Sequence, residues 1–262
     1  MPNDVPISAD SLDKKLRVLE TNFEKKLTAY FDSFEKSINN QVVRFRDSEK
    51  DLTLPKQKLE GLTNLYKNHF KQVEKISADY AKNDMIKLEP NAKKEILSLK
   101  TEKINEANIK YAKSLAKKQY DDYLEKSNKV LREAIKQNKE IKANQLKELI
   151  KESNEKFKNQ RVRATSQTEA NRVMNETKAY LIDKSNLGFK YKFICVIDDR
   201  TTKEICLPRH NLVFTKDTLK RYRNQLLPCL HVNCRSQLMP TRQNLTALDR
   251  LVSIIRKYPS LK

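Results

Sequence analysis

The chain has 262 residues and a mass of 30.8 kDa, enough for one or two domains with a hydrophobic core. Two glycines, no tryptophan and 34% charged residues argue against a glycine-rich β-sandwich, a TIM barrel or a Rossmann enzyme, and favour long solvated helices. The apolar runs are short, so no membrane span is expected. The first residues lack the apolar core of a secretory signal, and we expect the protein to be made and kept in a cytosol.

The net charge of +20 predicts attraction to polyanions, either nucleic acid or an acidic protein surface, although a generally lysine-rich composition would also produce it. Residues 1–160 contain 30 Lys and 4 Arg, whereas residues 161–262 contain 9 Lys and 11 Arg. This change in composition predicts two regions: an elongated helical region, 1–160, and a C-terminal module, 161–262.

The first region shows helical periodicity, with apolar side chains every three or four positions: Leu12, Leu16, Leu19, Phe23, Leu27, Tyr30, Phe34, Ile38 and Val42. We expect one helix over about 11–48, ended before Pro55, and a second over about 57–85. Residues 91–160 contain neither proline nor glycine and predict one long helix or two in series. Their narrow apolar stripe fits a helical bundle or a coiled-coil arm, and the lack of strict heptads favours the bundle.

The sequence of the C-terminal module predicts both helices and strands. A helix over 161–186 is followed by Gly188, which suits the left-handed position after a helix end. The segment YKFICVID predicts a strand, and a turn with a returning strand at Lys203–Cys206 would complete a β-hairpin. A short basic helix over Lys216–Gln225, a loop leading to a last strand, and a helix over Asn244–Lys257 follow. The expected fold is mainly α, with long amphipathic helices followed by a small α+β C-terminal module containing a hairpin and a Cys/His loop.

A cluster of cysteine and histidine follows the predicted hairpin. Zinc takes four tetrahedral nitrogen or sulfur ligands, and pairs separated by a few residues can point two side chains at one ion. We expect Cys206, His231 and Cys234 to be the main ligands, with Cys229 or His210 completing the set. Alternatively, the cysteines are small buried hydrophobic residues and His231 hydrogen-bonds a carbonyl. Cys195, on the predicted strand, is expected in the core.

Four cations lie close together in the predicted basic helix: Lys216, Lys220, Arg221 and Arg223. They predict phosphate contacts to nucleic acid without sequence preference, because no base-reading motif accompanies them. A solvated helix face is the alternative interpretation.

Three blocks of the module resemble the phage head-morphogenesis family, the minor capsid proteins similar to protein F of phage Mu. The blocks are TEANRVMNETKAYLIDKSNLG, DDRTTKEICLPRHNLVF and LPCLHVNCRSQLMP, which together cover under a third of the chain. The positions that match the family's pattern are Thr168, Glu169, Arg172, Asn175, Gly188, Asp198 or Asp199, Arg200, Thr201, Cys206, Leu212, Pro228, His231, Asn233, Cys234, Arg235 and Pro240. The chain departs from that pattern at Cys229 and Val232, which replace prolines, and at Ser236, which replaces a cysteine.

The resemblance implies a low-copy internal virion protein that acts in head assembly and in DNA packaging or ejection. Its implied partners are the portal and the capsid or scaffolding proteins, with DNA bound without sequence preference and no membrane. Its implied location is the capsid interior, and the host cytoplasm during assembly. Such a protein is a structural component and not an enzyme.

Several residues of the matched blocks are expected to be structural: Thr168, Glu169, Arg172, Asp199, Arg200, Asn233 and Arg235. Because buried charges need partners, we expect an Arg–carboxylate pair to tie the helix near residue 168 to the loop near residue 231.

Two other functions remain open at this point. One is a metal-dependent nuclease, in which His210 would act as the base beside a metal-activated water. The other is a nucleic-acid-binding adaptor of the host, acting through the cations of the basic helix.

Overall fold

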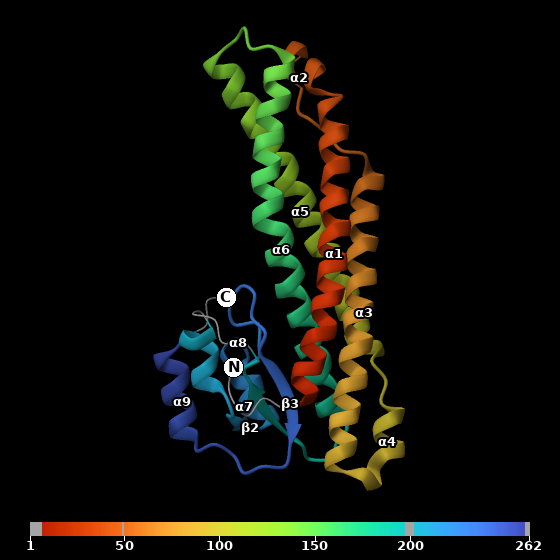
Figure 1. The fold of residues 1–262 in the computed structure, drawn as a ribbon, viewed down its shortest axis with the longest axis vertical. Helices are drawn as coiled ribbons and strands as arrows, with labels where there is room; N and C mark the ends of the chain where they lie inside the picture. The colour runs from red at the N-terminus through yellow and green to blue at the C-terminus, as the bar shows by residue number, and fades with distance from the viewer. Residues whose placement is uncertain (1–6, 49, 197–201, 260–262) are drawn as a thin grey trace. The chain divides into compact units, whose positions relative to one another are not determined.

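The computed structural model describes residues 7–48, 50–196 and 202–259. The fold is mainly α with a small antiparallel sheet near the C-terminus, as predicted (Figure 1). The helices are α1 (Ile7–Asn39), α2 (Val42–Ser48), α3 (Lys56–Leu88), α4 (Lys93–Ser98), α5 (Glu102–Gln137), α6 (Ala143–Lys184), α7 (Lys216–Arg221), α8 (Arg223–Leu226) and α9 (Leu248–Lys257). Short helical turns lie at η1 (Pro90–Ala92), η2 (Thr202–Cys206) and η3 (Leu207–Arg209), and the strands are β1 (Lys190–Ile194), β2 (Val213–Phe214) and β3 (Gln237–Thr241). Within the described residues, no helix has a stretch that could span a bilayer.

The helix boundaries differ from the prediction at two places. The first predicted helix is interrupted at Asn40 and Gln41, between α1 and α2. In contrast, α6 is one uninterrupted helix through residue 160, where we expected a boundary, because it contains neither proline nor glycine. The chain instead forms two compact units. Unit 1 comprises the described residues of Met1–Glu20, Phe70–Asn108 and Ser166–Lys262, and unit 2 comprises those of Thr21–His69 and Ile109–Thr165.

Unit 2 is a bundle of helical segments from α1, α3, α5 and α6, which lie side by side in Figure 1. An aromatic cluster holds its core, in which the ring of Phe31 lies 5.6 Å from Tyr123 and 5.4 Å from Phe157. Edge-to-face and stacked ring pairs at these separations stabilise a core beyond the area they bury. The predicted apolar stripe of α1 is buried at Phe23, Leu27, Phe34 and Ile38, among others.

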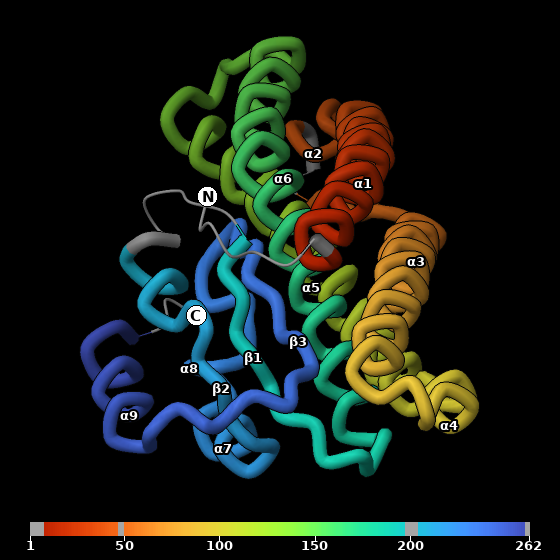
Figure 2. Tube along the Cα trace, turned by 60° about the horizontal axis from the view of Figure 1, so that its bottom comes forward, coloured from red at the N-terminus to blue at the C-terminus, as the bar shows by residue number. Residues whose placement is uncertain are grey.

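Unit 1 contains the sheet, whose strand order is β2-β1-β3 with both pairs antiparallel (Figure 2). Tyr191 and Phe193 of β1 are fully buried and share one core with Leu181 of α6 and Cys206. Gly188 has a φ of 68°, the left-handed conformation predicted after the helix end.

The predicted hairpin is wrong in its second strand. Residues 203–206 belong to the helical turn η2, and β1 pairs with β2 and β3 instead. The turn η2 brings Cys206 into the core, where it is fully buried. The predicted basic helix is divided at Tyr222 into α7 and α8, and the last helix begins at Leu248.

Candidate metal centre

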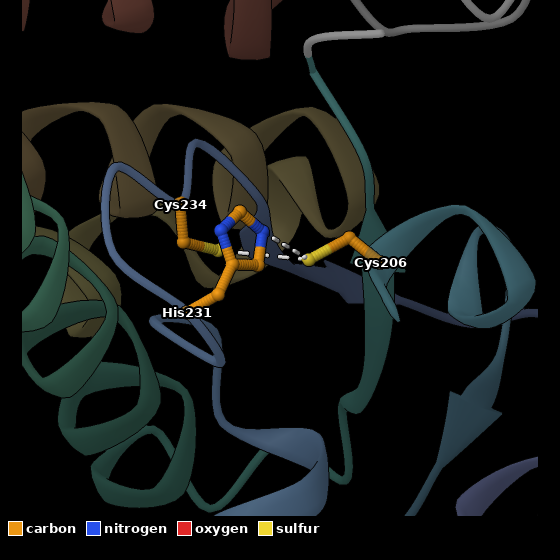
Figure 3. A group of neighbouring side chains, drawn as sticks. All are labelled: Cys206, His231 and Cys234. Atoms are coloured by element: carbon orange, nitrogen blue, oxygen red, sulfur yellow. Dashed lines mark hydrogen bonds between the residues drawn. The ribbon is translucent and has the colours of Figure 1, made fainter. Parts of the chain in front are cut away.

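Three of the five predicted metal ligands meet in the core of unit 1. Cys206 is the last residue of η2, and His231 and Cys234 lie in the loop between α8 and β3. The Sγ atom of Cys206 is 3.2 Å from Nε2 of His231 and 3.7 Å from Sγ of Cys234. Figure 3 shows the three side chains pointing toward one another. All three side chains are buried, and their ligand atoms lie within 4.8 Å of one another. This group could hold a metal ion.

The loop reaches this geometry through two residues in the left-handed conformation, Cys229 (φ 89°) and Asn233 (φ 62°). Such residues reverse the chain within a few positions, although the conformation is uncommon outside glycine. The turn at Asn233 lies between His231 and Cys234, so two ligands only three positions apart face the same point.

The surroundings of the group orient His231 for metal binding. Its Nδ1 atom lies 2.8 Å from the carbonyl oxygen of Val232. A carbonyl can only accept, so Nδ1 carries the proton and the lone pair of Nε2 faces Cys206. A hydrogen bond of this kind, from the ring nitrogen that does not face the metal, fixes the ring and the tautomer of metal-binding histidines. The backbone N–H of Cys229 donates to Sγ of Cys234 at 3.4 Å, which stabilises negative charge on that sulfur.

The pKa values of the two thiols are shifted in opposite directions. The hydrogen bond with Cys234, together with burial, raises the pKa of Cys206. Burial by itself would raise the pKa of Cys234, but the hydrogen bond with Cys206 acts against it, and the pKa is well below its ordinary value. The group therefore offers two sulfurs and one imidazole lone pair, and a metal cation would replace the remaining thiol proton.

The other two candidate ligands make contacts elsewhere. The Sγ atom of Cys229 donates to the carbonyl oxygen of Thr168 at 3.4 Å. Nδ1 of His210 accepts the backbone N–H of Cys195 at 3.0 Å. Neither belongs to the group of three. Cys195 is fully buried in the core, as predicted.

Thr168 joins α6 to the Cys/His loop. Its Oγ1 atom accepts the backbone N–H of Asn233 at 3.3 Å, and its carbonyl oxygen accepts from Cys229. Glu169 instead pairs with Arg172 one turn along the same helix, at 3.0 Å. Of the remaining predicted structural residues, Asp199 and Arg200 lie outside the described part of the chain, as do Asp198 and Thr201.

Arg235 is a buried structural residue, but its partner was not predicted. Its guanidinium binds Glu20 of α1 through two hydrogen bonds of 2.7 and 2.5 Å, and it lies 3.6 Å from Asp13. The expected link from the loop to a carboxylate near residue 168 is therefore wrong for Arg235, whose charge is neutralised by α1.

Asn175 fixes the start of β3 against α6. Its side chain is fully buried, donates to the carbonyl oxygen of Ser236 at 3.1 Å and accepts the N–H of Leu238 at 2.8 Å. These two bonds pair α6 with the strand backbone and hold the end of the loop that carries His231 and Cys234.

Sequence reasoning missed several buried charges of unit 1, among them Glu20, Lys178 and Arg209. Lys178 donates to Gln237 of β3 at 2.8 Å, and burial lowers its pKa to about 8. Arg209 binds the carbonyl oxygens of Ile205, Gln225 and Tyr258, which joins η2, α8 and the end of α9. Lys178 lies four positions after Met174 and three before Leu181, so helical spacing places it on the buried face of α6 although its charge argues for exposure.

The predicted nucleic-acid-binding cations lie on α7 and α8, and all four are exposed. Two of them have acidic partners on α6. Lys216 lies 3.4 Å from Asp183, and Arg223 pairs with Glu176. These pairs reduce the charge that α7 and α8 can offer to a polyanion.

The chain was also compared with known proteins. No protein-family model, curated protein or solved structure matches it. The residues and their geometry are therefore the basis for assigning a function.

Proposed function

We propose that this protein is a phage minor head protein, a structural virion component whose C-terminal module is held together by a zinc ion. The observation that supports this most is the meeting of Cys206 with His231 and Cys234, because these residues come from two separate blocks of the family pattern. Thr168 and Asn175, from the remaining block, contact the same loop.

The distances in the group fit zinc. Zinc bonds of about 2.3 Å to sulfur and about 2.0–2.1 Å to nitrogen imply tetrahedral edges of about 3.8 Å between sulfurs and about 3.5 Å between sulfur and nitrogen. The corresponding distances here are 3.7 and 3.2 Å. Two cysteines and a histidine are soft and borderline ligands of the kind that zinc prefers over calcium or magnesium.

Ser236 is our candidate for the fourth ligand of such a site. It is two residues from Cys234 and 1% exposed, and its Oγ atom is buried without a hydrogen-bond partner. The hydroxyl, or a water bound to it, would complete the tetrahedron. Complete burial of the ligands favours a structural zinc site over a catalytic one, which keeps a position open to substrate.

A zinc ion here would stabilise the part of unit 1 where α1, α6 and the loop before β3 meet. Such a module would present a fixed surface to the portal and to capsid or scaffolding proteins during head assembly. The same proposal places the protein inside the capsid, where its net charge of +20 would favour contact with DNA. No catalytic step is needed for this role.

Metal analysis of the purified full-length chain tests the zinc ion. We expect one zinc per chain, measured by inductively coupled plasma mass spectrometry, and loss of that zinc in Cys206→Ser and Cys234→Ser. Cys229→Ser is the matched control, because it removes a buried thiol from the same loop that lies outside the group. A chain without zinc, or a control that loses it equally, contradicts the assignment.

The virion role needs a separate experiment. We expect an affinity-tagged copy of this protein, expressed during phage growth, to be isolated in procapsids together with the portal protein. Its detection only outside procapsids and virions would contradict the proposed role, whatever the metal content.

A further inference from the structure

Two pockets lie at one end of unit 2, and Phe45 of α2 contributes to both. One, of about 470 Å³, is lined by Phe45, Arg46, Arg132, Ile135, Lys136 and Lys139. The other, of about 760 Å³, is lined by Gln41, Arg44, Phe45, Lys50, Asp51, Leu52 and Thr53. Phe45 is almost fully buried and holds α2 in place, while the cations around it are exposed. Figure 1 shows α2 at the same end of the unit 2 helices as the connection from α5 to α6.

Arginine is concentrated at these pockets. Residues 1–160 contain thirty lysines but only four arginines, and three of the four line the two pockets: Arg44, Arg46 and Arg132. A helix surface that only needs solubility can use lysine, as the rest of this region does. The planar guanidinium group binds phosphate oxygens through two parallel hydrogen bonds, which the ammonium group of lysine cannot do.

The pocket walls have a strong excess of positive charge. Lys50, Lys136 and Lys139 add to the three arginines, and Asp51 is the only acidic side chain among the described lining residues. Asp51 pairs with Arg132, but both side chains are more than half exposed, at 54% and 60%. An exposed pair of this kind contributes little to stability, so a phosphate group can compete for the arginine.

The loop between α2 and α3 is fixed next to the pockets. Asn128 of α5 accepts the backbone N–H of Leu52 at 2.7 Å and donates to its carbonyl oxygen at 3.3 Å. Gln41 does the same for Thr53, at 3.1 and 2.7 Å. Two side-chain amides therefore hold a loop that has no regular structure. A site that is ordered before binding loses less conformational entropy when a ligand binds.

From these observations, we propose that the end of unit 2 formed by α2, residues 50–53 and the C-terminal part of α5 binds the phosphodiester backbone of nucleic acid. Cations spread over two neighbouring pockets fit a chain of regularly spaced phosphates better than a single anion. Contacts to phosphates carry no base information, so the binding is independent of sequence. The site belongs to unit 2, shares no residue with the cations of α7 and α8, and does not require the metal centre.

Fluorescence anisotropy with a labelled duplex of mixed sequence, about 20 base pairs long, tests the site. We expect full-length wild-type protein to bind, with affinity falling steeply between about 50 and about 200 mM salt. Arg46→Gln/Lys136→Gln/Lys139→Gln should lower the affinity at low salt about tenfold or more and reduce the salt-dependence slope by about two to three, since each lost phosphate contact removes about 0.9. Arg44→Gln/Lys50→Gln, in the other pocket, should act in the same direction.

The matched control is Lys216→Gln/Lys220→Gln/Arg221→Gln, which removes the same charge from α7. We expect it to change the affinity less than threefold. An equal loss in this control would overturn the proposal, as would the absence of binding by the wild-type protein. Thermal denaturation verifies that each variant is folded, and the two pocket variants provide independent readouts.

Two competitors separate nucleic acid from other anions. Displacement of the duplex by inorganic phosphate at millimolar concentration would show a single-anion site and contradict backbone binding. Stronger competition by polyglutamate than by unlabelled duplex of equal charge would identify an acidic protein surface as the partner, and would also contradict it. The zinc content and procapsid association of the pocket variants report on the proposed function separately.

Discussion

The two terminal NH₂ groups of the Arg235 guanidinium each donate a hydrogen bond to one carboxylate oxygen of Glu20, which lies 215 positions earlier in the chain. Both side chains are buried, and Asp13 lies close to the same guanidinium. Burial raises the pKa of Glu20 to about 7, although the charge of Arg235 acts in the opposite direction. The pair joins α1 to the residue next to Cys234, so α1 supports the candidate metal centre directly.

Removing the cation should destabilise unit 1. We expect Arg235→Met to lower the free energy of unfolding by about 3–5 kcal/mol, because it leaves the buried carboxylate of Glu20 without the guanidinium that is hydrogen-bonded to it. Urea denaturation followed by circular dichroism measures this. Glu20→Leu/Arg235→Met should recover much of the loss, since an apolar pair needs no compensating charge. Arg242→Met, which removes a more exposed pair with Glu89, should cost no more than about 1 kcal/mol, and an equal cost would contradict the prediction.

Asn175 provides a test of the contact between α6 and β3. We expect Asn175→Ala to cost about 2–4 kcal/mol, because it leaves the N–H of Leu238 and the carbonyl of Ser236 buried without partners. Asn224→Ala, on the exposed side of α8, should stay within about 0.5 kcal/mol of wild type. Equal melting temperatures for the two variants would show that the bonds of Asn175 do not stabilise the strand.

His69 makes unit 2 sensitive to acid. It is buried against Phe23 with 4.0 Å between ring centroids, and burial lowers its pKa from 6.5 to about 3. Between these values the unfolded chain binds a proton that the folded chain does not, so stability falls as the pH is lowered from 6.5 towards 3. The complete effect is about 4–5 kcal/mol.

The matching variant is His69→Phe, which keeps a flat ring next to Phe23 but cannot titrate. The difference in unfolding free energy between wild type and variant should change in this pH range. Glu20 contributes equally to both proteins and therefore cancels from the difference. A difference that stays constant with pH would rule out a buried neutral His69.

Metal removal should weaken the folded chain if the zinc proposal holds. We expect a chelator to lower the melting temperature of the wild type and to leave Cys206→Ser unchanged, because that variant has already lost the ion. The structural reason is that a bound metal stabilises only the folded state, in which its three ligands meet. Cys229→Ser should respond to the chelator as the wild type does, and a wild type that melts equally with and without chelator would contradict the prediction.

The spacing of apolar residues predicted most of the helices, because it shows which face of each helix is buried. It was accurate for α1 and less so for α5, where Ala112, Ala116 and Tyr123 are buried while the predicted Tyr111 is 36% exposed. Alanine side chains are small and let neighbouring helices approach closely. Because they are only weakly apolar, they were not counted among the residues that define the apolar stripe. The second hairpin strand was wrong because Lys203–Cys206 is too short for alternation to separate a strand from a helical turn.

Ligand spacing predicted the three residues that meet at the candidate metal centre, because short separations restrict where two side chains can point. Spacing could not identify the support of the site from α1. Glu20 lies among other charged residues of an amphipathic helix, where a carboxylate normally faces water. The pairing of Glu20 with Arg235 is visible only in the folded structure.

The assembly of unit 1 from three separate stretches has a consequence for biosynthesis. The first turns of α1 leave the ribosome more than two hundred residues before β3, and at roughly 5–20 residues per second they wait ten seconds or longer for Gln237, which binds the carbonyl oxygen of Ala9. A nascent chain that stops before Arg235 leaves the carboxylate of Glu20 without the guanidinium that pairs with it. Unit 1 can therefore fold completely only after translation has reached its last strand. We expect truncated chains to leave this unit unfolded and to be degraded by proteases.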